Sequence, residues 1–259
     1  MTQNKMQSIL WGDNMELILS DAKLFRQSID AMVDLIKDAE FIVNEYGVSL
    51  KAIDAAQIAM VVFNMPKDVF EKFDVSGTTK LGVNLPSLSS ILKRAKNNDK
   101  LALKVKDKRL NVVLSSDNTR CFSINLLDIS SNEMPNPDIN FDATIKMKAN
   151  NLIEGVKDAG LFSTYLLFSV DPKTFKINAK GPQGDLENKT EMSSKQIMEK
   201  DIKKEATAMF SIEYLQNILK GASSETDIEL FIKTNAPLKV KYKISNALLE
   251  FFLAPRDYE

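Results

Sequence analysis

Short stretches of alternating apolar and polar residues recur along the chain at a nearly constant interval. Their starts lie about 63–65 residues apart, which indicates an internal repeat. Because alternation places every second side chain on the same face, each stretch is predicted to form a half-buried β-strand. The four predicted strands are Met15–Leu19, Lys80–Asn84, Ala143–Met147 and Ala206–Phe210.

A segment with apolar residues at helical spacing follows each of these strands. The spacing predicts a short amphipathic helix whose apolar stripe faces a core. The stripe of the first helix comprises Phe25, Ile29, Met32, Val33 and Ile36, and that of the second comprises Leu88, Ile91, Leu92 and Ala95. The stripe of the third comprises Leu152, Ile153, Val156 and Ala159, and that of the fourth comprises Leu215, Ile218, Leu219 and Ala222.

Three further strand-like stretches, joined by short turns, follow each predicted helix. In the first two repeats they are Phe41–Asn44, Val48–Asp54, Ile58–Asn64, Leu101–Val105, Leu110–Ser115 and Arg120–Leu126. In the last two they are Tyr165–Val170, Phe175–Ala179, Asp185–Met192, Asp227–Ile232, Leu238–Ile244 and Ala247–Leu253. The pattern therefore predicts an α+β protein in which a βαβββ unit is written four times.

Residues 127–141 interrupt the pattern near the middle of the chain. Pro135 and Pro137 remove backbone donors and favour extended conformations in the residues before them, so this segment is predicted to be an extended connector. The expected organisation is an N-terminal extension over residues 1–14, a domain over 15–126, the connector, and a second domain over 142–259. Residues 195–205 are charged and poor in apolar residues, which predicts a solvated loop.

The composition removes most catalytic and metal-binding arrangements. The 259 residues include no histidine and one cysteine, which excludes the Ser-His-Asp triad, histidine-bound zinc and thiolate clusters. The lone Cys121 is expected to be a small buried residue in a reducing compartment. Asp30 and Asp34, one helical turn apart, are the best carboxylate pair, and a solvated helix face explains them better than a metal site. We therefore expect no catalytic residue, no metal and no cofactor.

Several stretches, taken in this order and spacing, resemble one known family. They are Gly47–Leu50, Ile53–Ile58, Leu81–Leu85, Ser87–Lys93, Ala236–Val240, Tyr242–Ile244 and Phe252–Arg256. The chain resembles the sliding clamps of the proliferating cell nuclear antigen (PCNA) family of archaea and eukaryotes. The resemblance implies the α+β DNA-clamp fold: two similar domains of two repeats each, in a three-subunit ring whose inner face is lined by the helices.

The resemblance also implies that the polar helix faces meet double-stranded DNA without reading its sequence. The basic residues expected there are Lys23, Arg26, Lys93, Arg94, Lys96, Lys157 and Lys220. Phosphate contacts hold no base information, so a sparse basic lining lets a duplex slide while ring closure retains it. Glu154 and Glu213 lie where basic residues are common in the family, so closer DNA contact is expected at the first two helices.

The family further implies a pocket for short peptide motifs of DNA polymerase, the clamp loader, flap endonuclease and DNA ligase. The matching residues are Ile53, Ala56, Gln57, Ile58, Met134, Pro237, Phe252, Leu253, Ala254 and Pro255. Subunits are expected to join through two sheet edges. Their apolar residues are Leu110, Val112 and Leu114 on one edge and Phe175, Ile177 and Ala179 on the other.

Three functions remain open from the sequence. The first is a homotrimeric polymerase processivity factor for DNA replication and repair, and the second is one subunit of a heterotrimeric replication or checkpoint clamp. Lysines and arginines near both expected edges disfavour self-pairing, which keeps the second function open beside the first. The third is a carboxylate-dependent metal nuclease using Asp30 or Asp34. No apolar run is long enough to span a membrane, and an intracellular location is expected, cytoplasmic in an archaeal cell or nuclear in a eukaryotic one.

Overall fold

The computed structural model describes residues 15–129 and 137–256, and these divide into two compact units. The first unit comprises residues 15–52, 62–129 and 245–248. The second comprises residues 53–61, 137–244 and 249–256. The division falls within the predicted connector, but residues 53–61 belong to the second unit although they precede the connector by about 70 positions.

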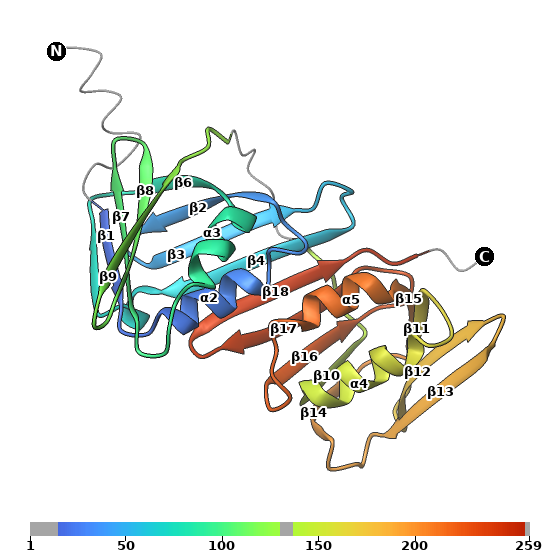
Figure 1. The fold of residues 1–259 in the computed structure, drawn as a ribbon. Helices are drawn as coiled ribbons and strands as arrows, with labels where there is room; N and C mark the ends of the chain where they lie inside the picture. The colour runs from blue at the N-terminus through green and yellow to red at the C-terminus, as the bar shows by residue number, and fades with distance from the viewer. Residues whose placement is uncertain (1–14, 130–136, 257–259) are drawn as a thin grey trace. The chain divides into compact units, whose positions relative to one another are not determined.

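The first unit contains two of the predicted repeats (Figure 1). The first repeat is β1 (Met15–Leu19), α2 (Ala22–Asp30), β2 (Asp38–Asn44), β3 (Gly47–Ile53) and β4 (Ala59–Pro66), followed by a 3₁₀ turn, η1 (Lys67–Val69), and β5 (Lys72–Val75). The second is β6 (Thr79–Asn84), α3 (Leu85–Leu92), β7 (Lys100–Lys106), β8 (Arg109–Ser115) and β9 (Thr119–Asn125). One sheet has the strand order β5-β1-β7-β8-β9, and another runs β4-β3-β2-β6.

The second unit repeats this plan (Figure 1). Its first repeat is β10 (Ala143–Lys148), α4 (Ala149–Ala159), β11 (Tyr165–Val170), β12 (Thr174–Gly181) and β13 (Gly184–Glu191), followed by β14 (Ile197–Ile202). Its second is β15 (Ala206–Ser211), α5 (Ile212–Leu219), β16 (Asp227–Ile232), β17 (Leu238–Ile244) and β18 (Ala247–Leu253). The strand orders are β13-β12-β11-β15 and β14-β10-β16-β17-β18.

Two strands lie outside the predicted βαβββ plan. The sequence analysis did not propose β5, and it was wrong to assign residues 195–205 to a loop, because β14 forms there. Strand β14 pairs with β10 alone in its sheet, and four of its six side chains are exposed. Backbone hydrogen bonds to β10 hold this edge strand in place, although it has no apolar face. An ion pair between Lys146 of β10 and Glu199 of β14, at 2.7 Å, adds to the pairing. Apolar alternation therefore could not reveal it.

The two helices of each unit lie side by side over the sheets (Figure 1). In the first unit, side-chain caps fix where the helices begin: Asp21 accepts a hydrogen bond from the Lys23 N–H at 2.7 Å, and Asn84 accepts one from the Ser87 N–H at 3.0 Å. The α-helix α2 ends at Asp30, earlier than its apolar stripe, and the chain continues in turns that still bury Met32 and Ile36. Each fully buried residue of this kind contributes about 2 kcal/mol.

Cys121 is exposed, contrary to the expectation of a buried thiol. It lies on β9, which pairs with β8 alone, and its side chain is on the opposite face from Phe122. The outer strand of a sheet buries less of its own length than the strands inside it.

Candidate functional site

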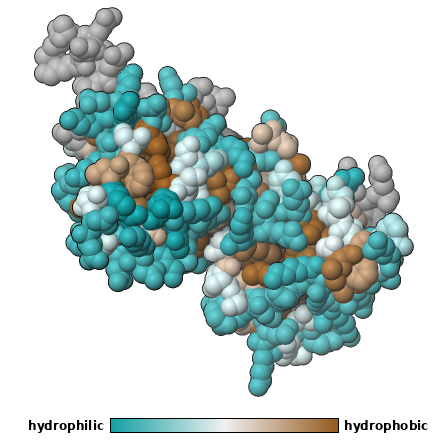
Figure 2. All heavy atoms as spheres, in the orientation of Figure 1, coloured by the Kyte–Doolittle hydropathy of each residue, from teal (hydrophilic) through white to brown (hydrophobic). Residues whose placement is uncertain are grey.

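The helix face of the first unit brings together five of the predicted DNA-facing residues. They are Lys23 and Arg26 on α2, and Lys93, Arg94 and Lys96 just after α3; Arg26 is half-buried and the others are exposed. The side-by-side packing of α2 and α3 places both groups on this face, which Figure 2 shows to be largely hydrophilic. The Lys93 ammonium lies 3.8 Å from the Asp30 carboxylate, so part of the positive charge is offset locally.

A buried ion pair fixes the turn that holds Arg94 and Lys96. Asp99 is fully buried and accepts a hydrogen bond from the Lys96 N–H at 2.6 Å. Arg120, which comes from β9, pairs with Asp99 and also donates to the Arg94 carbonyl at 2.7 Å. The hydrogen bond from the Lys96 N–H is the largest influence on the pKa of Asp99, and it lowers that pKa. Burial acts in the opposite direction, but interactions with Ser116 and Arg120 lower the pKa further, so it lies below its usual value. The sequence analysis did not identify either residue of this pair.

The helix face of the second unit is less basic. Lys157 on α4 and Lys220 after α5 are exposed, and they border a hollow of about 360 Å³ between the helices. Ile153 and Leu219 form part of its apolar floor. Lys157 also pairs with Glu154 at 2.8 Å, one helical turn earlier. The expectation of closer DNA contact at the first two helices therefore stays a prediction that agrees with the charge distribution.

The second unit also brings together the predicted peptide-pocket residues that the structure describes. Residues 54–58 connect β3 to β4, and the Ile58 carbonyl accepts a hydrogen bond at 2.8 Å from the Ala254 N–H just after β18. Ile53 and Ile58 are 38% and 37% exposed, unusually high values for large apolar side chains in this chain. Ala56 and Gln57 are exposed, whereas Pro237, Ala254 and Pro255 are half-buried.

Three of the predicted pocket residues are not observed at this surface. Phe252 and Leu253 are 7% and 0% exposed, so they support the surface from within the core rather than forming it. Met134 lies outside the residues that the structure describes. Ile53 and Ile58 are therefore the large apolar residues of the predicted pocket that the structure exposes, and docking of a peptide there stays a prediction.

The turn below this surface is built around Asp54, which is 8% exposed. Its carboxylate accepts hydrogen bonds from the N–H groups of Ala56 at 3.1 Å, Ile58 at 2.7 Å and Ala59 at 2.6 Å. It also accepts one from the Tyr214 hydroxyl at 2.8 Å, and Tyr214 comes from α5. Burial alone would raise the pKa of Asp54, but these four hydrogen bonds lower it overall.

The predicted interface strands are not sheet edges, and that part of the prediction is wrong. Strand β8 lies between β7 and β9, and β12 lies between β11 and β13. The six side chains expected at the interface are at most 3% exposed: Leu110, Val112, Leu114, Phe175, Ile177 and Ala179. They face the cores of their own units. The open edges next to them are β9 and β13, each paired on one side within the described residues.

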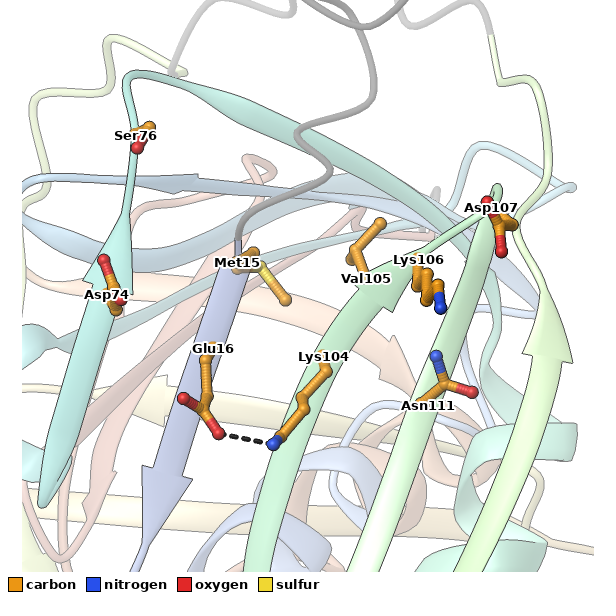
Figure 3. A pocket seen from close by; sticks show the side chains of 9 residues that line it. All are labelled: Met15, Glu16, Asp74, Ser76, Lys104, Val105, Lys106, Asp107 and Asn111. Atoms are coloured by element: carbon orange, nitrogen blue, oxygen red, sulfur yellow. Dashed lines mark ion pairs between the residues drawn. The ribbon is translucent and has the colours of Figure 1, made fainter.

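A hollow of about 670 Å³ in the first unit is lined by residues of β1, β5, β7 and β8 and of the turns beside them (Figure 3). Its lining combines the apolar side chains of Met15 and Val105 with charged groups, of which Glu16 and Lys104 point toward each other at 2.6 Å. Hydrogen bonds from Lys104 and then Lys72 lower the pKa of Glu16 to about 2. Three carboxylates and two ammonium groups line the hollow, so it has a small excess of negative charge.

Asp30, one of the two carboxylates considered as a pair, is engaged by neighbouring side chains. Asp30 accepts a hydrogen bond from Ser89 at 2.8 Å in addition to its pairing with Lys93. Within residues 15–129 and 137–256, no three histidine, cysteine, aspartate or glutamate side chains are grouped as metal ligands. No helix among those residues is both long enough and apolar enough to cross a lipid bilayer.

Family models match both halves of the chain. The model of the proliferating cell nuclear antigen N-terminal domain matches residues 14–134, and that of the C-terminal domain matches residues 136–257. The chain belongs to the PCNA family. A relative from Thermofilum pendens, described as a DNA polymerase sliding clamp, is 30% identical over 243 residues, which cover 93% of this chain and 98% of the relative.

Solved PCNA structures share the fold. PCNA from Thermococcus kodakaraensis has a TM-score of 0.90 at 24% identity, covering 93% of this chain and all of the other. PCNA from A. fulgidus, solved with the C-terminal region of FEN-1 bound to it, has a TM-score of 0.86 at 28% identity, covering 95% and 99%. PCNA membership confirms the predicted α+β clamp fold of two similar domains.

Proposed function

We propose that three copies of this chain close into a ring around duplex DNA and tether DNA polymerase and other DNA enzymes to it. The observation that supports this most strongly is the repeated pairing of helices: α2 with α3, and α4 with α5, each pair with cations on its solvent-facing side. Four such helices per subunit give a ring a continuous inner surface. The protein acts by topology, without catalysis of its own.

The distribution of charge suits a duplex that slides. The exposed cations are long, mobile side chains, and Asp30 and Glu154 offset two of them. Partial neutralisation keeps each phosphate contact shallow, so no register of the duplex is strongly preferred. Arg94 and Lys96 are held in a fixed turn by the Asp99–Arg120 pair, which makes this turn the strongest anchor for phosphate.

The inner-surface assignment is tested by Lys93→Ala combined with Lys96→Ala. We expect faster loss of loaded clamp from circular DNA, less processive synthesis and unchanged oligomeric mass. The salt slope of the weak binding to linear DNA should fall by about one for each phosphate contact that the ring loses. Lys106→Ala with Lys243→Ala, on sheet faces away from the core, is the matched control. Equal retention and equal salt slopes for the two double variants would place DNA elsewhere.

Partner enzymes dock, in this proposal, through short peptides on the apolar surface of Ile53 and Ile58. The relative from A. fulgidus binds the C-terminal region of FEN-1, which provides a suitable probe peptide. Exposed aliphatic side chains beside a rigid turn are the kind of anchor surface that dominates such interfaces. Polymerase, clamp loader and ligase would share this surface by the same chemistry.

Ring closure is assigned to the β9 edge of one subunit and the β13 edge of the next. The charges of the two strands do not repel each other: β13 has three acids and one lysine, whereas β9 has no acid and its one cation, Arg120, is paired with Asp99. The earlier reason to favour a mixed ring, like charges on both edges, applied to strands that are interior. A ring of identical chains is therefore the better supported form, and the heterotrimer is an outcome that a mass measurement would reveal.

A further inference from the structure

The turn between β3 and β4 has a conformation that its own sequence does not favour. The Asp54 N–H donates to the Ala59 carbonyl and the Gln57 N–H donates to the Asp54 carbonyl, both at 2.9 Å, which closes the turn. Gln57 has a φ of 59°, in the left-handed region that residues with a side chain seldom adopt. Such a conformation persists only where surrounding contacts fix it.

Asp54 supplies those contacts. Its buried carboxylate accepts the N–H groups of Ala56, Ile58 and Ala59, so one side chain orients three amides of the turn. A carboxylate at 8% exposure is costly unless its oxygens are fully hydrogen-bonded. The fourth hydrogen bond, from the Tyr214 hydroxyl at 2.8 Å, is the only one of the four that comes from outside the turn and the start of β4.

Tyr214 is well placed to hold Asp54 still. It lies 160 positions along the chain from Asp54 but within the same compact unit. The helix α5 is anchored by the buried Leu215, Ile218 and Leu219, so the position of the Tyr214 ring is set by the core. Burial, and then Asp54 itself, raise the pKa of Tyr214 to about 12, so the hydroxyl stays protonated and remains a donor at neutral pH.

We propose that Tyr214 is a positioning residue for partner docking: through Asp54 it holds the turn so that Ile53 and Ile58 form a preformed apolar surface for an incoming peptide. The inference rests on the docking function proposed above. It names a residue of α5, outside the peptide surface itself, as a determinant of partner affinity. A surface that is already in its binding conformation avoids the cost of ordering on binding.

The test compares Tyr214→Phe with the unaltered chain, using the FEN-1 C-terminal peptide as probe. The variant keeps the ring and removes the hydroxyl. We expect the dissociation constant to rise about five- to tenfold, mainly through slower association, because a smaller fraction of molecules has the competent turn. In the free protein, amide hydrogens of Ala56, Ile58 and Ala59 should exchange faster. Ring mass and DNA retention should not change.

Tyr242→Phe is the matched control. It removes a fully buried hydroxyl that donates to the Ile218 carbonyl of the same helix at 2.8 Å, so it should lower the melting temperature and leave peptide affinity unchanged. The double variant Asp54→Asn with Tyr214→Phe should bind the peptide no more weakly than Asp54→Asn alone. The reason is that both substitutions remove the same hydrogen bond between Tyr214 and Asp54.

The outcomes are distinguishable. If the unaltered chain does not bind the peptide, the proposed docking function fails and this inference with it. If the unaltered chain binds but Tyr214→Phe has the same affinity and the same amide exchange, only the positioning role is overturned. If Tyr242→Phe weakens peptide binding as much as Tyr214→Phe, the effect is general loss of stability and the inference is again wrong.

Discussion

At the scale of single residues, two buried carboxylates determine the geometry of the two candidate surfaces. Asp99 fixes the basic turn after α3, and Asp54 fixes the turn below the peptide surface. The sequence indicated which cations and aliphatic residues belong to each surface. It did not indicate Asp54 or Asp99, because their partners Tyr214 and Arg120 are distant along the chain and nothing in the local pattern joins them.

The Asp54 network predicts a specific dependence of stability on pH. The folded-state pKa of Asp54 is lowered, so its contribution is present above the unfolded pKa of about 3.9 and is lost as the pH falls through the folded value. Asp54→Asn should cost about 1–3 kcal/mol at pH 7, measured by urea unfolding. The difference from the unaltered chain should stay constant from pH 5 to 9 and shrink below pH 4.

Asp68→Asn, at an exposed position, should be neutral throughout that range. A loss for Asp54→Asn that is the same at pH 3 and pH 7 would mean that the carboxylate charge is not what holds the turn.

At the scale of elements, the sequence predicted the four α-helices and sixteen of the eighteen strands in the described residues, most of them close to their observed bounds. Apolar side chains at period two or at helical spacing report burial against a core, and that is what most of these elements do. The same signal misled the choice of interface strands. Regular alternation in β8 and β12 marks strands enclosed on both sides, whereas the open edge β9 has Cys121 and Ser123 exposed and a weaker pattern. Strands β5 and β14 were missed for the same reason.

The β9 edge can be blocked without disturbing its own sheet. The Leu126 N–H bonds to the Lys108 carbonyl across the pairing with β8, so by alternation the Ser123 N–H points to the open side. Ser123→Pro removes that donor and puts a ring in the path of a neighbouring strand, while edge strands tolerate proline at such positions. We expect a folded species of one-chain mass with a melting temperature near that of the unaltered protein.

Ser123→Ala keeps the N–H and should assemble normally. An assembled Ser123→Pro variant of unchanged mass would exclude β9 as the joining edge.

At the scale of the whole molecule, the fourfold repeat accounts for the regular order of helices and strands along the chain. Each repeat contributes one helix and the strands that support it, and membership of the PCNA family gives this build a function. The fold followed from the sequence because it depends on repeated burial. The joining of subunits did not, because it depends on hydrogen bonds of edge strands that a single chain leaves open.

The claim that copies of this chain close on themselves is tested most directly by the molar mass of the purified protein in solution, measured by light scattering at micromolar concentration. A ring of three copies has a mass of about 87 kDa, three times the 29.1 kDa of one chain, and this is the value we expect. A mass of one chain that persists at the highest soluble concentration would contradict it and would require different partner subunits to complete the ring.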